Sequence, residues 1–259
     1  MRLDIRLTEL GLAKSRTRAQ SLIAGGFVTV NGVPVTKASY DVADTDTVVL
    51  TGEEHPFVGR GGMKLDAALT RFGIDPAGLV CADIGASTGG FTDCLLRRGA
   101  AKVWAVDAGH GQLDPKLAAD PRVVNCEGVN ARALDPSILP ELVALAVLDL
   151  SFISQTLVLP ALVTVMTPDA GYVGLIKPQF ECGRDALGGG GIVRDKKQHT
   201  AAIRKVLAAL DAVGLGAVNL MKSPVRGGDG NTEFLVYARR GIPRAVGERE
   251  TAEAVQAKE

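Results

Sequence analysis

Between residues 79 and 239, short apolar segments alternate with stretches of helical periodicity, and this alternation limits the possible folds more than any other feature. The apolar segments are residues 79–85, 102–107, 122–128, 143–151, 171–178, 217–224 and 232–239. Apolar strands separated by helices are typical of a parallel sheet that is covered by helices on both faces. The pattern therefore predicts an α/β fold with a doubly wound, mostly parallel seven-stranded sheet.

The first 50 residues show a different pattern, which predicts two short helices followed by a strand-rich piece. Leu3, Leu7 and Leu10 fall on one face of the first helix, and Ser15 is a suitable N-cap for the second. The dipeptide Asn31-Gly32 lies between two short β segments and predicts a tight hairpin. We therefore expect a small α+β domain at this end of the chain.

A charged, glycine-containing stretch at residues 51–62 separates the two patterns and has the composition of a linker. We place the domain boundary near Val58. Residues 1–58 then form the small domain with its linker, and residues 59–259 form the α/β domain. The segment after Arg240 is polar, and we expect it to fray.

Charge is distributed unevenly, although the formal net charge of the chain is zero. Residues 1–37 carry six basic side chains against two acids, Asp4 and Glu9, which leaves a local charge of +4. The basic residues are Arg2, Arg6, Lys14, Arg16, Arg18 and Lys37. On charge alone, this stretch is equally consistent with a solvated helical face and with a surface that binds nucleic-acid phosphates.

Composition disfavours several classes of protein. The four cysteines form no CxxC pair and only three histidines are present, which argues against a zinc site. No apolar run is long enough to span a membrane, and charges from Arg2 to Arg18 interrupt any signal-peptide core. We therefore expect a cytoplasmic protein with reduced thiols, no metal and no membrane association.

The turn after the first predicted strand of the α/β domain has the features of a cofactor-binding turn. Gly85, Gly89 and Gly90 lie between this strand and a helix, where glycines let the backbone turn tightly and approach a ligand. Asp83 is placed to face the amino group of a methionine moiety, and Asp107 ends the next strand, where it can accept hydrogen bonds from a ribose. The spacing is not GxGxxG, which disfavours dinucleotide binding, while a plain strand-to-helix turn remains an alternative.

Two further polar residues end predicted strands, Asp149 the fourth and Lys177 the fifth. The carboxyl ends of parallel strands lie at one edge of a sheet, so we expect both residues on the same edge as Asp83 and Asp107. Polar residues at the ends of apolar runs are not typical of a core. Their position indicates a reaction centre next to the cofactor crevice.

Several motifs together closely resemble the TlyA family of rRNA 2′-O-methyltransferases, some of which are labelled haemolysins. They are RGGMKL, DIGASTGGFTDCLLRRGA, VDAGHGQL, NAR, DLSFIS, IKPQFE and GNTEFL, and they span nearly the whole chain. The resemblance implies a Rossmann-like class I methyltransferase domain that uses S-adenosyl-L-methionine and acts on ribosomal RNA or ribosomal subunits. It also implies cytidine targets in large-subunit (23S) rRNA and, in some members, in small-subunit (16S) rRNA. The short segment before Lys14 favours the large subunit alone.

The family is similar to the FtsJ-type 2′-O-methyltransferases, which use a Lys-Asp-Lys-Glu tetrad. Carried over by motif, the tetrad is Lys64, Asp149, Lys177 and Glu233. The resemblance places Asp107 at the cofactor ribose and Asn130 near the adenine. The full set of implied cofactor residues is Asp83, Gly85, Ser87, Gly89, Gly90, Phe91, Asp107, Asn130 and Asp149.

Residues 2–32 resemble the S-four type of RNA-binding domain, which is also found in pseudouridine synthases. In that domain the first two helices and the following hairpin face the RNA. The resemblance therefore favours the phosphate-binding interpretation of the basic stretch. The implied RNA-binding residues are Arg2, Arg6, Lys14, Arg16, Arg18, Asn31, Lys37 and Arg60.

Transfer of a methyl group to a ribose 2′-hydroxyl explains why these residue types are needed. The hydroxyl is a poor nucleophile at neutral pH, so a base must remove its proton or the site must stabilise the alkoxide. We expect Lys177 to be the base, with Lys64 and Glu233 tuning its pKa and Asp149 positioning it. No metal is required, because a sulfonium is itself a strong electrophile.

Two parts of the sequence keep more than one interpretation. Phe152 and Phe180, beside the predicted strand ends, are candidates either to stack on a flipped-out target nucleotide or to pack in the core. Residues 183–195 contain four consecutive glycines, Gly188 to Gly191. We interpret this stretch either as a mobile loop that covers the site or contacts RNA, or as a plain connection.

Three other functions remain as alternatives: a haemolysin-type cytolysin, a non-catalytic RNA-binding or ribosome-assembly protein, and a methyltransferase that acts on a base or a protein. The absence of membrane-seeking segments disfavours the cytolysin. An intact tetrad and glycine turn disfavour the non-catalytic protein. The third is disfavoured because the chain lacks an Asn/Asp-Pro-Pro-Tyr motif. The sequence does not indicate an oligomeric state.

Overall fold

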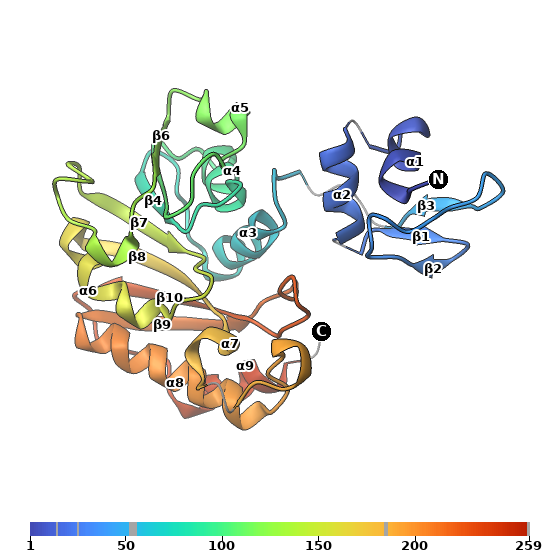
Figure 1. Ribbon diagram of the computed structural model, residues 1–259. Helices are drawn as coiled ribbons and strands as arrows, with labels where there is room; N and C mark the ends of the chain where they lie inside the picture. The colour runs from blue at the N-terminus through green and yellow to red at the C-terminus, as the bar shows by residue number, and fades with distance from the viewer. Residues whose placement is uncertain (14, 25, 52–55, 184–185, 258–259) are drawn as a thin grey trace. The chain divides into compact units, whose positions relative to one another are not determined.

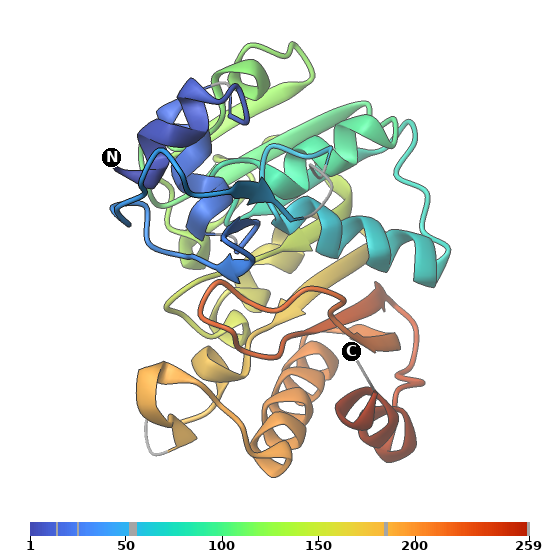
Figure 2. The same cartoon turned by 90° about the vertical axis from the view of Figure 1, so that its right-hand side faces the viewer.

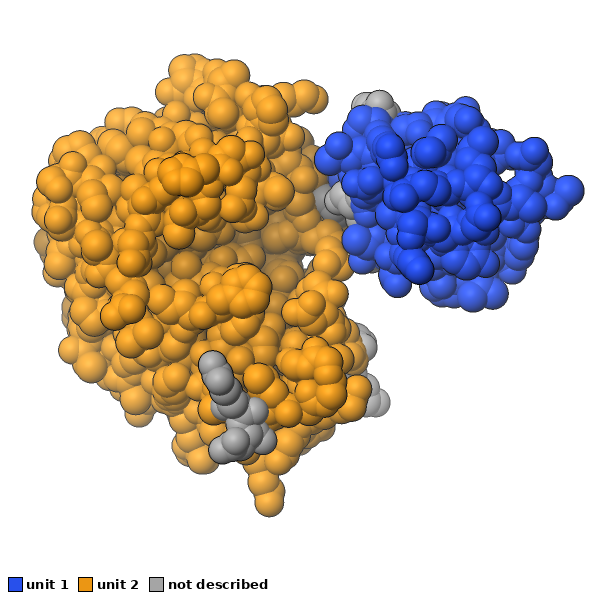
Figure 3. Space-filling model, viewed as in Figure 1, with its two compact units in different colours: residues 1–54 blue, residues 55–259 orange. Residues whose placement is uncertain are grey.

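The computed structural model describes residues 1–13, 15–24, 26–51, 56–183 and 186–257. The chain divides into two compact units, residues 1–54 and residues 55–259 (Figure 3). The first unit has a hydrophobic core of its own, and the second has one core on each face of its sheet. Each unit is therefore described by itself.

The first unit packs two short helices against a small antiparallel sheet (Figure 1). The helices are α1 (Leu3–Glu9) and α2 (Arg16–Ala24), and the sheet consists of β1 (Val28–Val30), β2 (Val33–Pro34) and β3 (Val48–Leu50) in the order β2-β1-β3. The predicted N-cap of α2 is confirmed, because Ser15 Oγ accepts a hydrogen bond from the backbone N–H of Arg18 at 3.2 Å.

The hairpin predicted at Asn31-Gly32 is also confirmed. Both residues have a positive φ, +50° and +80°, which is the conformation that a two-residue turn between antiparallel strands requires. The side chain of Asn31 is held within the unit. It donates to Asp46 Oδ1 at 2.8 Å and accepts from the N–H of Thr47 at 2.9 Å.

One expectation for the first helix is wrong. Leu10 does not belong to its apolar face, because α1 ends at Glu9 and Leu10 is 45% exposed. The chain turns at Gly11, whose φ is +69°, and Ala13 enters the core instead. The leucine spacing was correct for a longer helix, and the early glycine ends the helix before Leu10.

The second unit contains the predicted seven-stranded, mostly parallel sheet. The strand order is β6-β5-β4-β7-β8-β10-β9, and β10 runs antiparallel to both of its neighbours. The strands are β4 (Val80–Ile84), β5 (Lys102–Asp107), β6 (Val123–Glu127), β7 (Val143–Leu148), β8 (Met166–Ile176), β9 (Leu215–Lys222) and β10 (Phe234–Arg240).

Helices cover both faces of this sheet, as the apolar strands predicted (Figures 1 and 2). One face carries α3 (Gly61–Phe72), α4 (Gly90–Arg97) and α5 (Pro115–Ala118), and the other carries α6 (Leu159–Leu162), α8 (Lys196–Ala212) and α9 (Glu248–Gln256). Alternate residues of β7 enter the two cores: Leu145 and Val147 face α3 and α4, whereas Ala146 and Leu148 face the other layer. Short helical segments are α7 (Pro178–Glu181), η1 (Ala131–Ala133), η2 (Gln155–Leu157), η3 (Val163–Val165) and η5 (Gly189–Gly191).

The order of the strands determines where a ligand can bind. From β4 the chain adds β5 and β6 on one side, and then returns to add β7 and β8 on the other. The carboxyl ends of β4 and β7 therefore lie next to each other where the chain changes direction. In sheets of this kind, the crevice outside that point is the usual ligand site.

The expectation that the chain frays after Arg240 is wrong. Residues 248–256 form α9, which packs against α8 and β9 and buries Thr251, Ala254 and Val255. The helix begins with a local hydrogen bond in which the N–H of Gly247 donates to Glu250 Oε2 at 2.8 Å. Only a narrow apolar stripe is needed to dock this helix, and the many polar residues around it conceal the stripe in the sequence.

The docking of α9 can be tested with Val255→Asp. An unpaired carboxylate in this apolar contact should lower the free energy of unfolding by about 2 kcal/mol. The melting temperature, followed by circular dichroism, should then fall by roughly 4–8 °C. Ala252→Asp, on the exposed side of the same helix, is the matched control and should change the melting temperature little. Equal melting temperatures for the two variants would show that α9 does not pack against the domain.

Candidate active site

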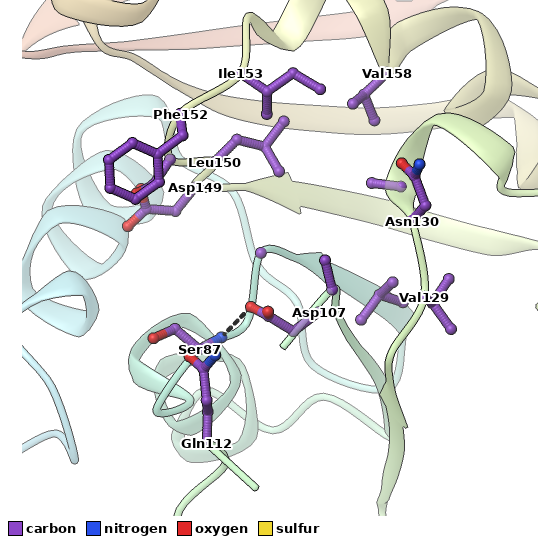
Figure 4. A pocket seen from close by; sticks show the side chains of 15 residues that line it. Ser87, Asp107, Gln112, Val129, Asn130, Asp149, Leu150, Phe152, Ile153 and Val158 are labelled. Carbon is purple, nitrogen blue, oxygen red and sulfur yellow. Dashed lines mark hydrogen bonds between the residues drawn. The ribbon is translucent and has the colours of Figure 1, made fainter. Parts of the chain in front are cut away.

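A cavity of about 430 Å³ lies at the carboxyl ends of the central strands of the second unit (Figure 4). Its walls come from the segments that follow β4, β5, β6 and β7. Polar side chains of Ser87, Asp107 and Gln112 lie across it from the apolar side chains of Leu150 and Ile153. The lining is completed by Gly85, Val106, Ala108, Val129, Asn130, Ala131, Asp149, Ser151, Phe152 and Val158.

The turn from β4 into α4 needs its first glycine for a close backbone approach. Gly85 has φ +87°, and a Cβ at this position would lie 2.5 Å from the backbone oxygen of Asp149. Gly89 has a different role, because a Cβ there would lie 2.3 Å from a methyl group of Leu117. A Cβ on Gly90 would lie 3.1 Å from the backbone nitrogen of Gly62. Among these three glycines, only Gly85 lines the cavity.

Asp107 occupies the end of β5, as predicted, and its carboxylate is fixed by two backbone hydrogen bonds. Oδ2 accepts from the N–H of Ser87 at 2.8 Å, and Oδ1 accepts from the N–H of Gly109 at 2.7 Å (Figure 4). Ser87 also has a positive φ of +48°, so the chain turns sharply at the residue whose N–H donates to this carboxylate. The arrangement holds a negative charge at the cavity wall with lone pairs left for a hydroxyl-bearing ligand.

Asp83 lies deeper than predicted and does not line the cavity. Its side chain is fully buried, and Oδ2 accepts a hydrogen bond from Thr92 Oγ at 2.7 Å. Among the described residues, no hydrogen-bond partner faces Oδ1. Burial raises the pKa of Asp83 to about 7, and the nearby carboxylate of Asp149 adds to the increase.

A smaller cavity of about 180 Å³ adjoins the first one. The two share Gly85, Ser87, Asp149 and Ser151 as lining residues. The smaller cavity is further lined by Gly59, Arg60, Gly61, Ala86, Thr88, Gly90, Phe91 and Lys177. Phe91, predicted as a cofactor residue, therefore belongs to the smaller cavity, and its ring packs beside Gly61.

Two lysine–carboxylate pairs lie close to these cavities, and of the four residues only Asp149 and Lys177 line them. Lys177 Nζ lies 2.6 Å from Asp149 Oδ1 and also donates to Ser151 Oγ at 3.1 Å. Lys64 Nζ lies 2.5 Å from Glu233 Oε2, and these two side chains are only 9% and 2% exposed. Buried charges are stable only when they are paired, and each lysine has its own carboxylate here.

The fold brings these four residues together from distant parts of the sequence. Asp149 follows β7 and Lys177 follows β8, whereas Lys64 lies on α3. Glu233 precedes β10, whose first residue, Phe234, pairs with Ile176. The antiparallel register therefore places Glu233 opposite the end of β8.

The electrostatics of Glu233 show that the two pairs influence each other. Burial raises the pKa of the Glu233 carboxyl above its ordinary value. The positive charges of Lys64 and Lys177 act in the opposite direction, and the negative charge of Asp149 adds to the increase. The four predicted tetrad residues therefore form one charge cluster with alternating signs.

Phe152 is not packed in the core. It is 92% exposed and has φ +65°, which a bulky side chain rarely adopts. Its ring contacts that of Phe180 with centroids 5.5 Å apart, and Lys177 Nζ lies 5.9 Å from the Phe180 ring centroid. The structure thus places an exposed aromatic surface at the rim of the cavity.

The far wall of the cavity contains one predicted residue and one that the sequence analysis missed. Asn130 lines the cavity, and its Oδ1 accepts a hydrogen bond from the N–H of Arg132 at 3.1 Å. Gln112 also lines it, on a loop whose N–H groups at Gly111 and Gln112 donate to the carboxylate of Glu127 at 2.7 and 3.0 Å. The HGQ sequence of that loop carries no distinctive chemistry, so only the fold reveals its position.

The glycine-rich segment is tied to the stretch before β10 that contains Glu233. Asn231 is buried, accepts a hydrogen bond from the N–H of Val193 at 2.9 Å and donates to the backbone oxygen of Gly191 at 3.1 Å. Gly190 and Gly191 both have a positive φ. This part of the predicted loop is therefore anchored to the domain. Arg184, at its start, lies outside the described residues.

In the first unit, the basic side chains are organised around a buried acid. Asp4 is fully buried and accepts hydrogen bonds from Arg2 and Arg16, each at 2.9 Å, and from Gln20 at 2.8 Å. The Arg2 guanidinium holds the pKa of Asp4 well below its usual range, and Gln20 and Arg16 contribute in the same direction. The two arginines remain about half exposed.

The other predicted RNA-binding residues have varied surroundings. Arg6 is partly buried, 3.6 Å from Glu9 and 3.7 Å from Asp44, and Arg18 is also partly buried. Lys37 is exposed, and Arg60 lines the smaller cavity of the second unit. Lys14 lies outside the described residues.

The described part of the chain lacks two kinds of feature. No described helix combines the length and the apolar character that crossing a bilayer would need. Within the same ranges, no group of three or more histidine, cysteine or acidic side chains is arranged to hold a metal ion.

The raised pKa of Asp83 predicts a pH-dependent stability. Between about pH 4 and 7, the folded chain keeps a proton that the unfolded chain has released, so the free energy of unfolding falls as the pH rises. The loss is at most about 1.4 kcal/mol per pH unit. Asp83→Asn removes this titration. In urea unfolding, its stability relative to the unmodified chain should therefore increase from pH 5 to pH 7.5. A difference that does not change with pH would contradict the assignment.

Comparison with known proteins identifies the family. Residues 57–240 match the FtsJ-like methyltransferase family, and residues 1–48 match the S4 domain. The 16S/23S rRNA (cytidine-2′-O)-methyltransferase TlyA of Mycobacterium tuberculosis is 44% identical over 255 residues, which cover 98% of this chain and 95% of that protein. Hemolysin A of Brachyspira hyodysenteriae is 41% identical over 238 residues, which cover 92% of this chain and 99% of that protein.

A solved structure shows the same similarity in three dimensions. A Streptococcus thermophilus protein that carries the name hemolysin matches with a TM-score of 0.79 and 37% identity, covering 98% of this chain and 94% of its own. The resemblance noted in the sequence and the predicted fold class are thus confirmed. The chain belongs to the FtsJ-like methyltransferase family and carries an S4 domain at its amino-terminal end.

Proposed function

We propose that this protein transfers a methyl group from S-adenosyl-L-methionine to the ribose 2′-hydroxyl of a cytidine in ribosomal RNA. Large-subunit rRNA is the proposed main target and small-subunit rRNA a second one, and the protein acts in the cytoplasm. The observation that carries the proposal is the Lys177–Asp149 pair at the junction of two cavities, with Lys64–Glu233 beside it. A relative of 44% identity is named for this reaction.

The larger cavity fits the proposed cofactor in size and in chemistry. A volume of about 430 Å³ lies within the range of small-molecule sites. The Asp107 carboxylate can accept hydrogen bonds from ribose hydroxyls, and the apolar side chains of Leu150, Ile153 and Val158 suit a flat base. The carboxylates of Asp107 and Asp149 in its wall also favour a positively charged ligand. When bound, S-adenosyl-L-methionine supplies an electrophilic methyl group on a sulfonium.

Lys177 is the proposed general base. Its Nζ projects where the two cavities meet, so a hydroxyl in the smaller cavity can reach it. Asp149 and Ser151 hold its Nζ at this point, at 2.6 and 3.1 Å.

The other three charged residues position and tune this base. Asp149 holds the Lys177 ammonium at the strand end, and Glu233 holds Lys64 in the buried part of the cluster. A Lys64 without Glu233 would be an unpaired buried cation, which is strongly disfavoured. Phe152, exposed at the rim, is placed to stack on a base that has left its helix.

The alternatives weighed from the sequence explain fewer of these observations. A cytolysin has no use for a lysine–carboxylate pair in the wall of a ligand-sized cavity, and no described helix is long and apolar enough to cross a membrane. A non-catalytic RNA-binding protein would gain nothing from burying the Lys64–Glu233 pair, because removing charges from water is costly. Methyl transfer to a ribose hydroxyl gives every member of the cluster a role.

The base is tested by Lys177→Ala. Loss of a general base should lower the rate of RNA methylation by at least about 100-fold, while calorimetry should show unchanged binding of S-adenosyl-L-methionine. Lys102→Ala is the matched control, because it removes an ion-paired lysine from the start of β5, at the opposite end of that strand from the cavity. Full methylation by Lys177→Ala would overturn the assignment.

The site of methylation is tested with radiolabelled cofactor and, separately, isolated rRNA, large subunits, small subunits and tRNA. Transfer to a 2′-hydroxyl makes one phosphodiester linkage resistant to alkali, so the label should remain in a dinucleotide that begins with cytidine. Label that is released with alkali-labile linkages, or that remains on protein, would contradict ribose methylation.

Binding of RNA by the first unit is tested with Arg16→Ala. If Arg16 contacts a phosphate, the variant should bind RNA more weakly. The slope of log affinity against log salt concentration should then decrease in magnitude by about 0.7–0.9. Arg249→Ala, which removes an exposed arginine from α9, is the control. Identical slopes for Arg16→Ala and the unmodified chain would argue against a phosphate contact.

A further inference from the structure

A second buried carboxylate, Glu181, lies close to the proposed reaction centre and has no role in the tetrad. It is the last residue of α7, and its side chain is 2% exposed. Two segments meet at this residue. We name residues 149–155 the Asp149 loop and residues 177–181 the Lys177 segment.

Glu181 joins these two segments through both of its oxygens. Oε1 accepts a hydrogen bond from the backbone N–H of Gln155 at 2.9 Å, and Oε2 accepts one from Ser154 Oγ at 2.5 Å. Lys205 supplies the balancing charge, with Nζ 3.3 Å from Oε2 and 2.8 Å from the backbone oxygen of Glu181. The carboxylate is thus paired, and its acceptors are directed at the end of the Asp149 loop.

The Asp149 loop needs to be held because it contains a disfavoured conformation. Phe152 has φ +65°, and non-glycine residues keep such a conformation only when their surroundings impose it. The loop is fixed at its start, where the N–H of Asp149 donates to the backbone oxygen of Ile84 at 3.0 Å. Glu181 fixes its other end through Ser154 and Gln155.

The same two segments also meet on the side of the cavities. There, Lys177 Nζ contacts Asp149 at 2.6 Å and Ser151 at 3.1 Å, and the rings of Phe152 and Phe180 pack together. These contacts are partly exposed and involve groups that must engage substrate. The contact through Glu181 is buried, so it can keep the two segments in register while the exposed groups exchange partners.

The sequence around Glu181 is adapted to this buried network. Gln155 Nε2 donates to the backbone oxygen of Leu175 at 3.3 Å, and Gln155 Oε1 accepts from Tyr172 Oη at 2.5 Å. A Cβ at Gly174 would lie 2.3 Å from Tyr172 Oη and 2.7 Å from Gln155 Oε1. Glycine at this position of β8 therefore leaves the space that these polar side chains occupy.

We infer that Glu181 is a positioning residue for methyl transfer, which acts by fixing the Asp149 loop against the Lys177 segment. It sets the distance between Lys177 and Asp149 and the orientation of Phe152. The inference rests on the proposed function, since it assigns Glu181 to the same reaction.

The test uses Glu181→Met, which keeps the length of the side chain and removes both acceptors. We expect kcat for RNA methylation to fall roughly 10- to 100-fold, because small displacements of reacting groups have effects of that size. Binding of S-adenosyl-L-methionine should weaken much less than kcat falls, since the Asp149 loop lines the cavity but Glu181 itself does not. Glu181→Gln, which keeps one acceptor oxygen, should restore part of kcat.

Tyr172→Phe is the matched control. It removes the hydrogen bond from Tyr172 Oη to Gln155 Oε1 in the same buried network and leaves both contacts of Glu181 with the loop. It should lower the melting temperature and leave kcat unchanged. If Glu181→Met and Tyr172→Phe reduce kcat in proportion to their losses in melting temperature, Glu181 is structural and the inference fails.

A double-mutant cycle gives a second, independent readout. Ser154→Ala removes one of the two groups that Glu181 holds, so its effect on log kcat should be non-additive with that of Glu181→Met. Additive effects would overturn the inference. If Glu181→Met does not fold, the test rests on the kcat of Ser154→Ala alone. If the unmodified chain methylates no RNA, the proposed function fails and the inference falls with it. If the unmodified chain does methylate RNA, the proposed function stands, and the variants alone decide whether the inference fails.

Discussion

The proposed active site depends on pairing each of two neighbouring lysines with its own carboxylate. Lys64 pairs with Glu233, and Lys177 pairs with Asp149. The Lys64–Glu233 pair is almost fully buried, so removal of either partner would leave an unpaired buried charge, which costs more than the pair contributes. Lys177 and Asp149 are partly exposed and line the cavities. The fold must therefore deliver four side chains to one point.

The topology of the sheet does this with strand ends. The change of direction at β4 places the carboxyl ends of β4 and β7 side by side, and the antiparallel β10 adds the start of a strand at the same edge. Glu233 therefore contacts Lys64 and lies near Lys177, although it follows Lys177 by 56 positions in the chain. Close backbone packing adds a second constraint, because only glycine at position 85 allows the turn after β4 to touch the backbone of Asp149. The proposed cofactor cavity and the charge cluster share that contact.

The sequence predicts the position of a residue where a local pattern determines it, and it fails where only tertiary contacts do. Strand-end residues such as Asp107, Asp149 and Lys177 were predictable, because the period of the apolar runs locates the strand ends. The helix α9 was missed because its apolar stripe is narrow, and Leu10 was misplaced because a glycine ended its helix early. The sequence carries no pattern for the positive φ and exposure of Phe152 or for the buried contacts of Glu181. Both arise where segments distant in the sequence meet in the fold.

Buried carboxylates have a common role in both units. In the first unit, Asp4 orients the guanidinium groups of Arg2 and Arg16 while leaving them about half exposed. In the second unit, Glu233 is likewise buried and holds Lys64, and Glu181 is buried and holds the end of the loop whose residues 149–153 line the larger cavity. A carboxylate has only hydrogen-bond acceptors, so a buried one can fix several donors at once. Because it is buried, it does not itself contact the ligand. Long cationic side chains lose much conformational entropy when they bind a phosphate or a substrate. By restricting such side chains before binding, a buried acid reduces that loss.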